Sequence, residues 1–195
     1  MAITVDLLEA FLKCPTKCFL RAREEAETGN AYADWVRTKS DVFRGEGIKR
    51  LLAGAKLDDC ATGTEGIESR RLAQIQSAAD FFAESENLRS SCHAVERIPS
   101  SGRGRAAQLI PIRFAFSNKI TRHDKLLLAF DALVISKVLA REVALGRVVY
   151  GDDHATLNVK VSLDAKRNRR IPYPLKCLPD VQILRLGFLG VSPLG

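Results

Sequence analysis

The sequence predicts one α/β (α+β) domain, with a small mixed sheet flanked by helices and a helical region at the N-terminus. Apolar residues recur at helical spacing through much of the first 90 residues, whereas the alternation typical of strands first appears at Cys92–Ile98 and returns at Leu157–Val161. A helical segment separates these two strand regions. This order of helices, hairpin, helix and hairpin favours a mixed sheet covered by helices.

The chain is predicted to open with two short helices. Thr4 can cap the first helix, and Pro15 interrupts it. The second helix continues toward the acidic segment 24–27 and is broken by the segment 28–30. The apolar positions of the two helices are Val5, Leu8, Phe11, Leu12, Phe19 and Leu20.

Two longer helices are predicted next, separated by a loop over Gly54–Gly66. One runs from Tyr32 to about Leu52, and the other from Glu68 to Glu84. The expected core residues of the first are Trp35, Val42, Ile48 and Leu51, and those of the second are Leu72, Ile75, Ala79 and Phe82. The helical part of the domain is therefore expected to cover residues 1–90.

The sheet core is expected over residues 91–163. Strands are predicted at Cys92–Ile98 and Leu109–Phe116, and Pro111 in the second suggests an edge or a bulge. Thr121 caps a helix from Arg122 to about Ala140, which is apolar around most of its circumference and therefore covered on more than one side. A last hairpin joins Val148–Tyr150 to the strand ending at Val161 through the turn Gly151–His154. Residues 164–195 form a basic, proline-rich tail that we expect to be weakly structured.

The charge of the chain favours a polyanionic partner. Lys and Arg total 30 against 23 Asp and Glu, which leaves a net charge of +7. With 195 residues, of which 46% are apolar, the chain can bury one core of ordinary size. A nucleic acid is therefore an expected partner.

No segment suggests a membrane or a secreted protein. No apolar stretch approaches the roughly 20 residues that a membrane span needs, and residues 1–13 have no signal-peptide pattern. The five cysteines are odd in number and irregularly spaced, which is typical of a reducing compartment. We therefore expect a cytoplasmic protein with no membrane partner.

Several segments of the chain follow one another in an order that is typical of one protein family. A leucine-rich helix leads into Cys14–Pro15 and then Phe19–Leu20. Residues 110–116 read Ile-Pro-Ile-Arg-Phe-Ala-Phe, and the helix 124–133 and the strand 146–151 follow. Together these segments cover roughly residues 3–161 and resemble the RecB-like nucleases of the PD-(D/E)XK superfamily, including the exonuclease of CRISPR adaptation.

The resemblance implies a restriction-endonuclease-like fold in which two acidic side chains bind Mg²⁺ or Mn²⁺ and a lysine assists the attacking water. The family's Glu-x-Lys positions fall on Arg113 and Ala115, and its first acid falls on His93 or Glu96. Glu96, His93 and Arg113 are thus the candidate catalytic residues. Because arginine cannot ligate a cation and alanine has no amine, we expect impaired cleavage, with Arg113 paired to Glu96 across the hairpin.

The resemblance leaves three functions open. The first is DNA binding without cleavage through Arg103, Arg105, Lys119 and Arg122. The second is an active Mg²⁺- or Mn²⁺-dependent nuclease that combines Glu96 with Asp152 or Asp131. The third is an inactive interaction module or fragment of a larger nuclease-helicase, because larger relatives carry helicase and RNase H-like domains and this chain looks degenerate and C-terminally truncated.

No iron–sulfur cluster is expected, although some relatives bind one. Those relatives use an early cysteine and three cysteines near the C-terminus, whereas only Cys177 follows Cys92 here. Cys14 and Cys18 are therefore expected to be buried as small apolar residues. No other cofactor is expected.

Overall fold

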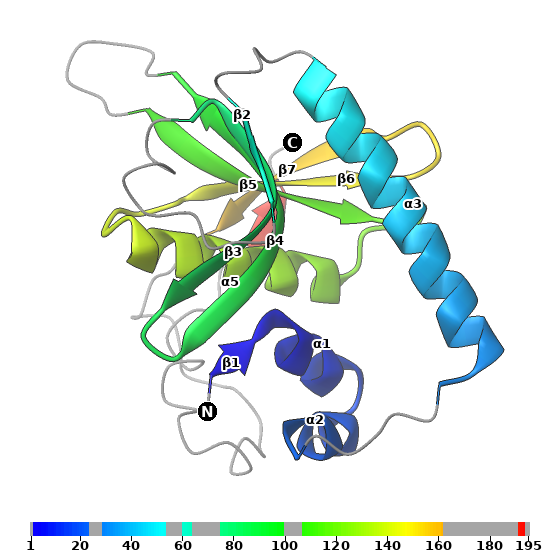
Figure 1. Ribbon diagram of the computed structural model, residues 1–195. Helices are drawn as coiled ribbons and strands as arrows, with labels where there is room; N and C mark the ends of the chain where they lie inside the picture. Colours follow the sequence, from blue (N-terminus) through cyan, green and yellow to red (C-terminus); the bar gives the residue numbers. More distant parts are fainter. Residues whose placement is uncertain are drawn as a thin grey trace.

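The computed structural model describes residues 2–23, 29–53, 60–63, 75–99, 107–161 and 191–193. Within these ranges, eight strands form one mixed sheet in the order β2-β3-β4-β5-β6-β7-β8, and β1 (Ile3–Thr4) pairs with the start of β4 (Figure 1). Helices α1 and α5 cover one face of the sheet, and α3 covers the other. The predicted mixed sheet flanked by helices is confirmed.

The first helix begins where the sequence predicts. Helix α1 (Val5–Lys13) follows Thr4, whose hydroxyl accepts a hydrogen bond from the Leu7 amide at 3.2 Å. Val5 and Leu8 are buried in the core that α1 shares with α5. Pro15 not only separates the two helices but also begins α2 (Pro15–Ala22), since proline is tolerated in the first turn of a helix.

Helix α3 (Ala31–Ala53) has the predicted span but only part of the predicted core. Ile48 is buried, whereas Trp35 and Val42 are 52% and 54% exposed. The prediction for these two residues was wrong because the buried side chains of α3 begin only at Phe43. The first half of the helix extends past the sheet, so no other described part of the chain covers Trp35 and Val42 (Figure 1).

The predicted helix Glu68–Glu84 is wrong where the structure describes it. Residues 77–85 form strand β3 (Ser77–Ser85), antiparallel to β4 (Leu88–Ile98), while Leu72 lies outside the described residues. Ala79 and Phe82 do recur at helical spacing, but pairing with β4 overrides that local pattern. Strand β2 (Cys60–Thr62) likewise lies inside the predicted loop Gly54–Gly66. The sheet therefore includes parts of the region 1–90 that was predicted to be helical.

Strand β5 (Gln108–Ala115) is an interior strand, not an edge. It pairs with β4 on one side and with β6 (Leu145–Tyr150) on the other, and its pairing with β6 begins at Ile112. Pro111 thus lies just before the ladder with β6, where the absence of an amide hydrogen costs no hydrogen bond to that strand. The predicted turn 151–154 connects β6 to β7 (Ala155–Val161).

Helix α5 (Arg122–Val138) is the most deeply buried helix among the described residues. Its first turn carries a capping box, in which the Thr121 hydroxyl accepts from the Asp124 amide and the Asp124 carboxylate accepts from the Thr121 amide. The predicted Thr121 cap and the predicted burial on more than one side are both confirmed. Nine of its seventeen residues are buried, from Leu126 to Ile135.

Of the predicted tail 164–195, the structure describes only β8 (Val191–Pro193), which pairs antiparallel with β7. The rest of that segment lies outside the described residues. Within the described ranges, no helix is both long enough and apolar enough to cross a membrane.

Gly47 brings α3 into direct contact with β5. A Cβ atom at this position would lie 2.3–2.4 Å from two ring carbons of Phe114, whereas a Cβ at Gly45 would meet nothing within 4 Å. Alanine favours a helix interior over glycine by about 1 kcal/mol. We therefore expect Gly45→Ala to raise the free energy of unfolding by up to about 1 kcal/mol. Gly47→Ala should lower it by about 1–3 kcal/mol through overpacking.

Urea denaturation followed by circular dichroism measures both changes. The two variants have the same substitution in the same helix, so their helix propensities are matched. Equal stabilisation by both would show that α3 does not approach β5 this closely.

Candidate functional site

A local distortion of the β3–β4 ladder positions His93. The register runs from Ser77↔Glu96 to Ala79↔Ala94 and resumes at Phe81↔Cys92, passing over Asp80 and His93. Asp80 has a positive φ of 51°, which is uncommon for a residue other than glycine. Ala78 and Phe81 are three residues apart, yet both belong to the core on the α5 side. The side chains of β3 therefore change face at this point.

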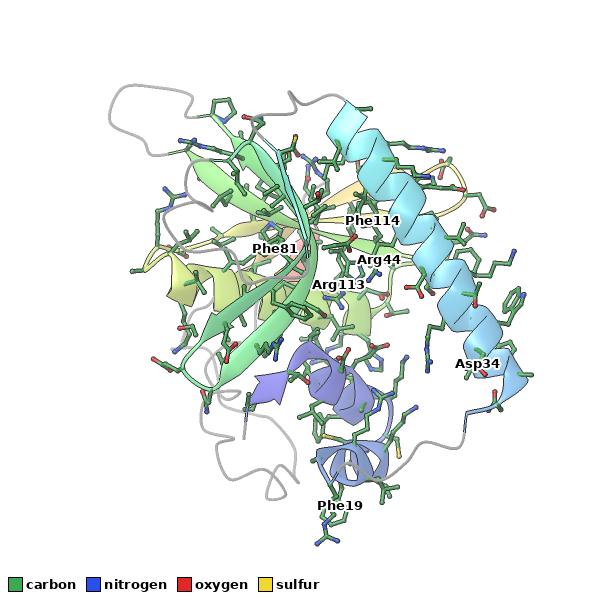
Figure 2. All side chains as sticks on the ribbon, in the orientation of Figure 1. Phe19, Asp34, Arg44, Phe81, Arg113 and Phe114 are labelled. Carbon is green, nitrogen blue, oxygen red and sulfur yellow. The ribbon has the colours of Figure 1, made fainter. Side chains whose placement is uncertain are left out.

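His93 is held as a neutral imidazole. Its Nδ1 accepts a hydrogen bond from the Phe114 amide at 3.2 Å, so that nitrogen carries no proton and the tautomer is Nε2–H. Removal from solvent lowers the pKa of His93 well below its ordinary value, and the charges of Arg113 and Arg44 lower it further. One of the two candidate positions for the family's first acid therefore holds a group that resists protonation. Figure 2 labels Arg44, Arg113 and Phe114.

Arg113 is buried in a three-residue polar cluster with Asp131 and Ser90. Its guanidinium donates to Asp131 Oδ2 at 2.5 Å, and the Ser90 hydroxyl donates to Asp131 Oδ1 at 2.5 Å. Asp131 is only 1% exposed. Burial raises the pKa of Asp131, while the positive charge of Arg113 and the hydrogen bonds from both partners oppose that rise. The three residues come from β5, α5 and β4, so the cluster fastens the helix to two central strands.

The predicted pairing of Arg113 with Glu96 was wrong. Glu96 lies opposite Ile110 in the β4–β5 register, which is three residues, or about 10 Å, from Arg113 along the strand. Its carboxylate instead accepts from Arg147 of β6 at 2.6 Å. Arg147 lines a pocket with Gly47 and Leu51 of α3, whereas Arg113 faces α5. Glu96 and Arg113 therefore lie on opposite faces of the sheet.

The structure does not gather the predicted catalytic residues into one metal-binding set. Glu96 is on the α3 side, Arg113 on the α5 side, and His93 at the distortion between β3 and β4. Across the described ranges, no group of three or more His, Cys, Asp or Glu side chains is arranged to hold a metal ion. What the site can provide is a buried positive charge and a neutral imidazole.

The sequence interpretation missed Glu9 of α1, which lies close enough to Arg113 to feel its charge. Burial by itself would raise the pKa of Glu9, but the hydrogen bond from Lys13 and the charges of Lys13, Arg113 and Arg21 lower it below the ordinary value. The role of Asp131 was also missed, although a signal existed. Asp131 is the single charged residue within the apolar stretch 126–135 of α5, and a carboxylate in such a stretch predicts a buried cationic partner.

Cys92 lies beside this site, whereas Cys14 and Cys18 belong to the N-terminal helices. Burial and the negative charge of Asp131 raise the pKa of Cys92, so its thiol is unreactive. Cys18 is buried as predicted, whereas Cys14 is exposed because it caps the start of α2.

The two described residues predicted to contact nucleic acid lie together at the start of α5. Lys119 and Arg122 are exposed, and neither forms an ion pair within the described part of the chain. Arg103 and Arg105 lie outside the described residues. Gly151 of the β6–β7 turn donates its amide to Ser117 at 2.9 Å, so that turn adjoins the loop that carries Lys119.

A pocket of about 300 Å³ adjoins the same turn, between α3 and the sheet. Arg50 and Arg147 line it, and its apolar wall includes Phe114 and Val149. His154 of the turn also lines it and stacks on Phe43 of α3, with 4.4 Å between the ring centroids. Asp152 and Asp153 are exposed turn residues, as the Gly-Asp-Asp sequence predicts.

Asp131→Ala should lower the free energy of unfolding by about 3–5 kcal/mol, because it leaves the Arg113 guanidinium buried without a partner. The double variant Arg113→Met/Asp131→Leu should recover most of that loss, since well-packed apolar residues often replace a buried ion pair at little cost. As a control on the same helix, Lys137→Met breaks the exposed pair with Glu86 and should cost at most about 1 kcal/mol. Urea denaturation distinguishes these cases, and a double variant no better than Asp131→Ala would contradict the paired arrangement.

His93 should make stability depend on pH. Because its pKa in the folded chain is below the ordinary value of 6.5, the unfolded chain binds a proton first on acidification. The stabilisation is present above about pH 6.5 and is lost as the pH falls toward the folded pKa. His93→Asn keeps an acceptor for the Phe114 amide but cannot titrate. Its free energy of unfolding should therefore fall less between pH 7 and 5 than that of the wild type, and parallel curves would refute this assignment.

Comparison with known proteins leaves the family of the chain unassigned. No protein-family model matches the sequence, and no curated protein matches it.

Proposed function

We propose that this chain is a RecB-like, PD-(D/E)XK-type domain that binds DNA without metal-dependent cleavage. One observation carries the proposal. At the position where the resemblance expects a metal-binding carboxylate, the chain has the Arg113 guanidinium, buried and hydrogen-bonded to Asp131. A permanent positive charge repels a divalent cation and cannot ligate it. The remaining family position, Ala115, supplies no amine.

The positions of the segments that resemble the family support the fold part of the proposal. The Cys14–Pro15 segment joins α1 to α2, the altered Pro-x-Glu-x-Lys segment forms β5, and the following segments form α5 and β6. Helix α5 packs over β5 through Asp131, and β6 runs parallel to β5. These contacts are what a helix and strand following the Glu-x-Lys strand would make in such a domain.

The rearranged nuclease is less well supported. Its two acids would have to lie within about 2–2.6 Å of one cation. Glu96 is on the α3 side with Arg147, while Asp131 is on the α5 side with Arg113. Asp152 is an exposed residue of the β6–β7 turn. Glu96 and Asp131 therefore lie on opposite faces of the sheet, each paired with an arginine, and cannot share one cation.

Charge supports DNA as the ligand. The chain carries +7 overall, and Lys119, Arg122 and Arg50 are exposed cations without an ion-pair partner in the described ranges. The loop of Lys119 and the pocket of Arg50 both adjoin the β6–β7 turn. Such cations bind phosphates in a sequence-independent and salt-dependent way.

The cellular context is part of the proposal. The free thiols of Cys14, Cys60 and Cys92 support a reducing, cytoplasmic compartment. A helicase or RNase H-like partner follows from the resemblance alone, and the DNA-binding role does not require one.

The test combines binding and cleavage of end-labelled single- and double-stranded DNA in Mg²⁺, Mn²⁺ or EDTA. We expect no metal-dependent cleavage, equal binding with and without EDTA, and an affinity that falls as salt rises. Lys119→Ala/Arg122→Ala should weaken binding to all sequences and reduce the slope of log affinity against log salt by about 1–2. Lys160→Ala, an exposed lysine on β7, is the matched control.

Two other outcomes have definite meanings. Metal-dependent cleavage that Glu96→Ala abolishes would replace the proposal with a rearranged nuclease. Failure to bind either form of DNA at low salt would leave the interaction module as the remaining function.

A further inference from the structure

The first half of α3 carries an aromatic stripe that no other described part of the chain covers. Tyr32 is 73% exposed, and Trp35 and Val42 are each more than half exposed. With Lys39 they occupy positions i, i+3, i+7 and i+10, which follow one side of a helix. Residues 31–42 span about 18 Å of helix. Within that stretch only Val36 and Ser40 are even half-buried.

The two rings of the stripe form a ready-made stacking surface. Tyr32 and Trp35 have ring centroids 6.1 Å apart and planes inclined by 23°. Figure 2 shows Asp34, which lies between them in sequence, at the far end of α3 from the sheet. Large aromatic side chains that are exposed together mark an interaction site more often than single exposed apolar residues do. The stripe therefore calls for a partner that offers flat apolar faces.

The charges of α3 favour a negatively charged partner. The helix has five Lys and Arg against three Asp and Glu. Lys39, Lys49 and Arg50 form no ion pair in the described part of the chain, whereas Asp34 and Asp41 are paired with Arg37 and Arg44. Lys39 thus places a free cation between the rings and Val42. A partner must accept stacking and also bring negative charge.

A second copy of the chain fits this stripe poorly. The stripe of Tyr32, Trp35, Lys39 and Val42 contains no acidic side chain that could pair with the Lys39 ammonium of another copy. Three apolar side chains from each copy also fall short of the roughly 1,200 Å² that a stable interface buries.

We infer that Tyr32, Trp35 and Lys39 form a binding platform for single-stranded nucleic acid, with unpaired bases stacked on the rings and a backbone phosphate on the lysine. This inference rests on the proposed nucleic-acid binding and adds the strandedness of the ligand. In a duplex the base faces are already stacked on one another, so only a single strand can present them. The platform is separate from the cations at the start of α5.

Trp35 is the only tryptophan in the chain, so intrinsic fluorescence reports directly on this platform. Titration with a 15-nucleotide oligothymidine should quench the emission to saturation. A duplex of the same length and inorganic polyphosphate, which offer charge without free bases, should cause little change at equal phosphate concentration. A signal that responds equally to polyphosphate would overturn the inference.

Variants then test the stacking by anisotropy of a labelled oligothymidine. Trp35→Ala and Tyr32→Ala should each weaken binding about tenfold, as expected for loss of one base–aromatic stack. Trp35→Phe should retain most of the affinity. Lys39→Ala should reduce the salt slope by about 0.7, the value for one phosphate contact with a single strand. Phe19→Ala removes a partly exposed aromatic ring from α2 and should leave binding unchanged.

The outcomes separate this inference from the proposed function. DNA binding that depends on Lys119 and Arg122 but not on Trp35 would overturn the platform and leave the proposed function intact. A concentration-dependent dimer mass that Trp35→Ala abolishes, measured by light scattering, would assign the stripe to a second copy instead. Absence of binding to any nucleic acid would overturn both.

Discussion

The buried contact between Arg113 and Asp131 is the constraint on which the centre of this protein depends. A guanidinium and a carboxylate in the interior each cost several kcal/mol in lost hydration unless they satisfy one another. Here they do so between β5 and α5, and Ser90 of β4 completes the carboxylate's hydrogen bonding. Removing one partner leaves the other buried without a partner. The position of α5 over the sheet therefore depends on this pair. Burial lowers the pKa of His93 and the charge of Arg113 lowers it further, whereas burial raises the pKa of Cys92 and the charge of Asp131 raises it further.

Opposite faces of the sheet have different chemistry as a result. On the α5 side, Arg113, Asp131 and Ser90 hydrogen-bond to one another in the interior. On the α3 side, Glu96 and Arg147 pair at the margin of an open pocket. A strand places successive side chains on alternate faces, and the distortion at Asp80 and His93 changes which residues point to which side. Glu96 and Asp131 thus lie on opposite faces of the sheet. Together with Arg113 at the position of a family carboxylate, this separation is the physical reason for proposing binding without hydrolysis.

Helix α3 performs two tasks with its two halves. The second half lies on β5 through the contact of Gly47 with Phe114 and helps to form the pocket. The first half has little buried surface and exposes Tyr32 and Trp35. Tertiary packing, rather than local propensity, normally stabilises a helix, so the packed half provides the anchor for the exposed half. A rigid arm with aromatic rings is better suited to binding an extended ligand than a flexible loop, because less conformational entropy is lost.

The sequence by itself determined the features that depend on neighbours along the chain. Thr4 and Thr121 predicted helix starts because a hydroxyl bonds the amides of the next turn, and Gly151–His154 predicted a turn for similarly local reasons. The motif positions also pointed to His93, Glu96 and Arg113 as the residues to inspect. Tertiary structure alone decided that Ser77–Ser85 is a strand, that Arg113 bonds Asp131, and that Trp35 is exposed. Each of these outcomes depends on what lies opposite in space, and that surface comes from residues far away in sequence.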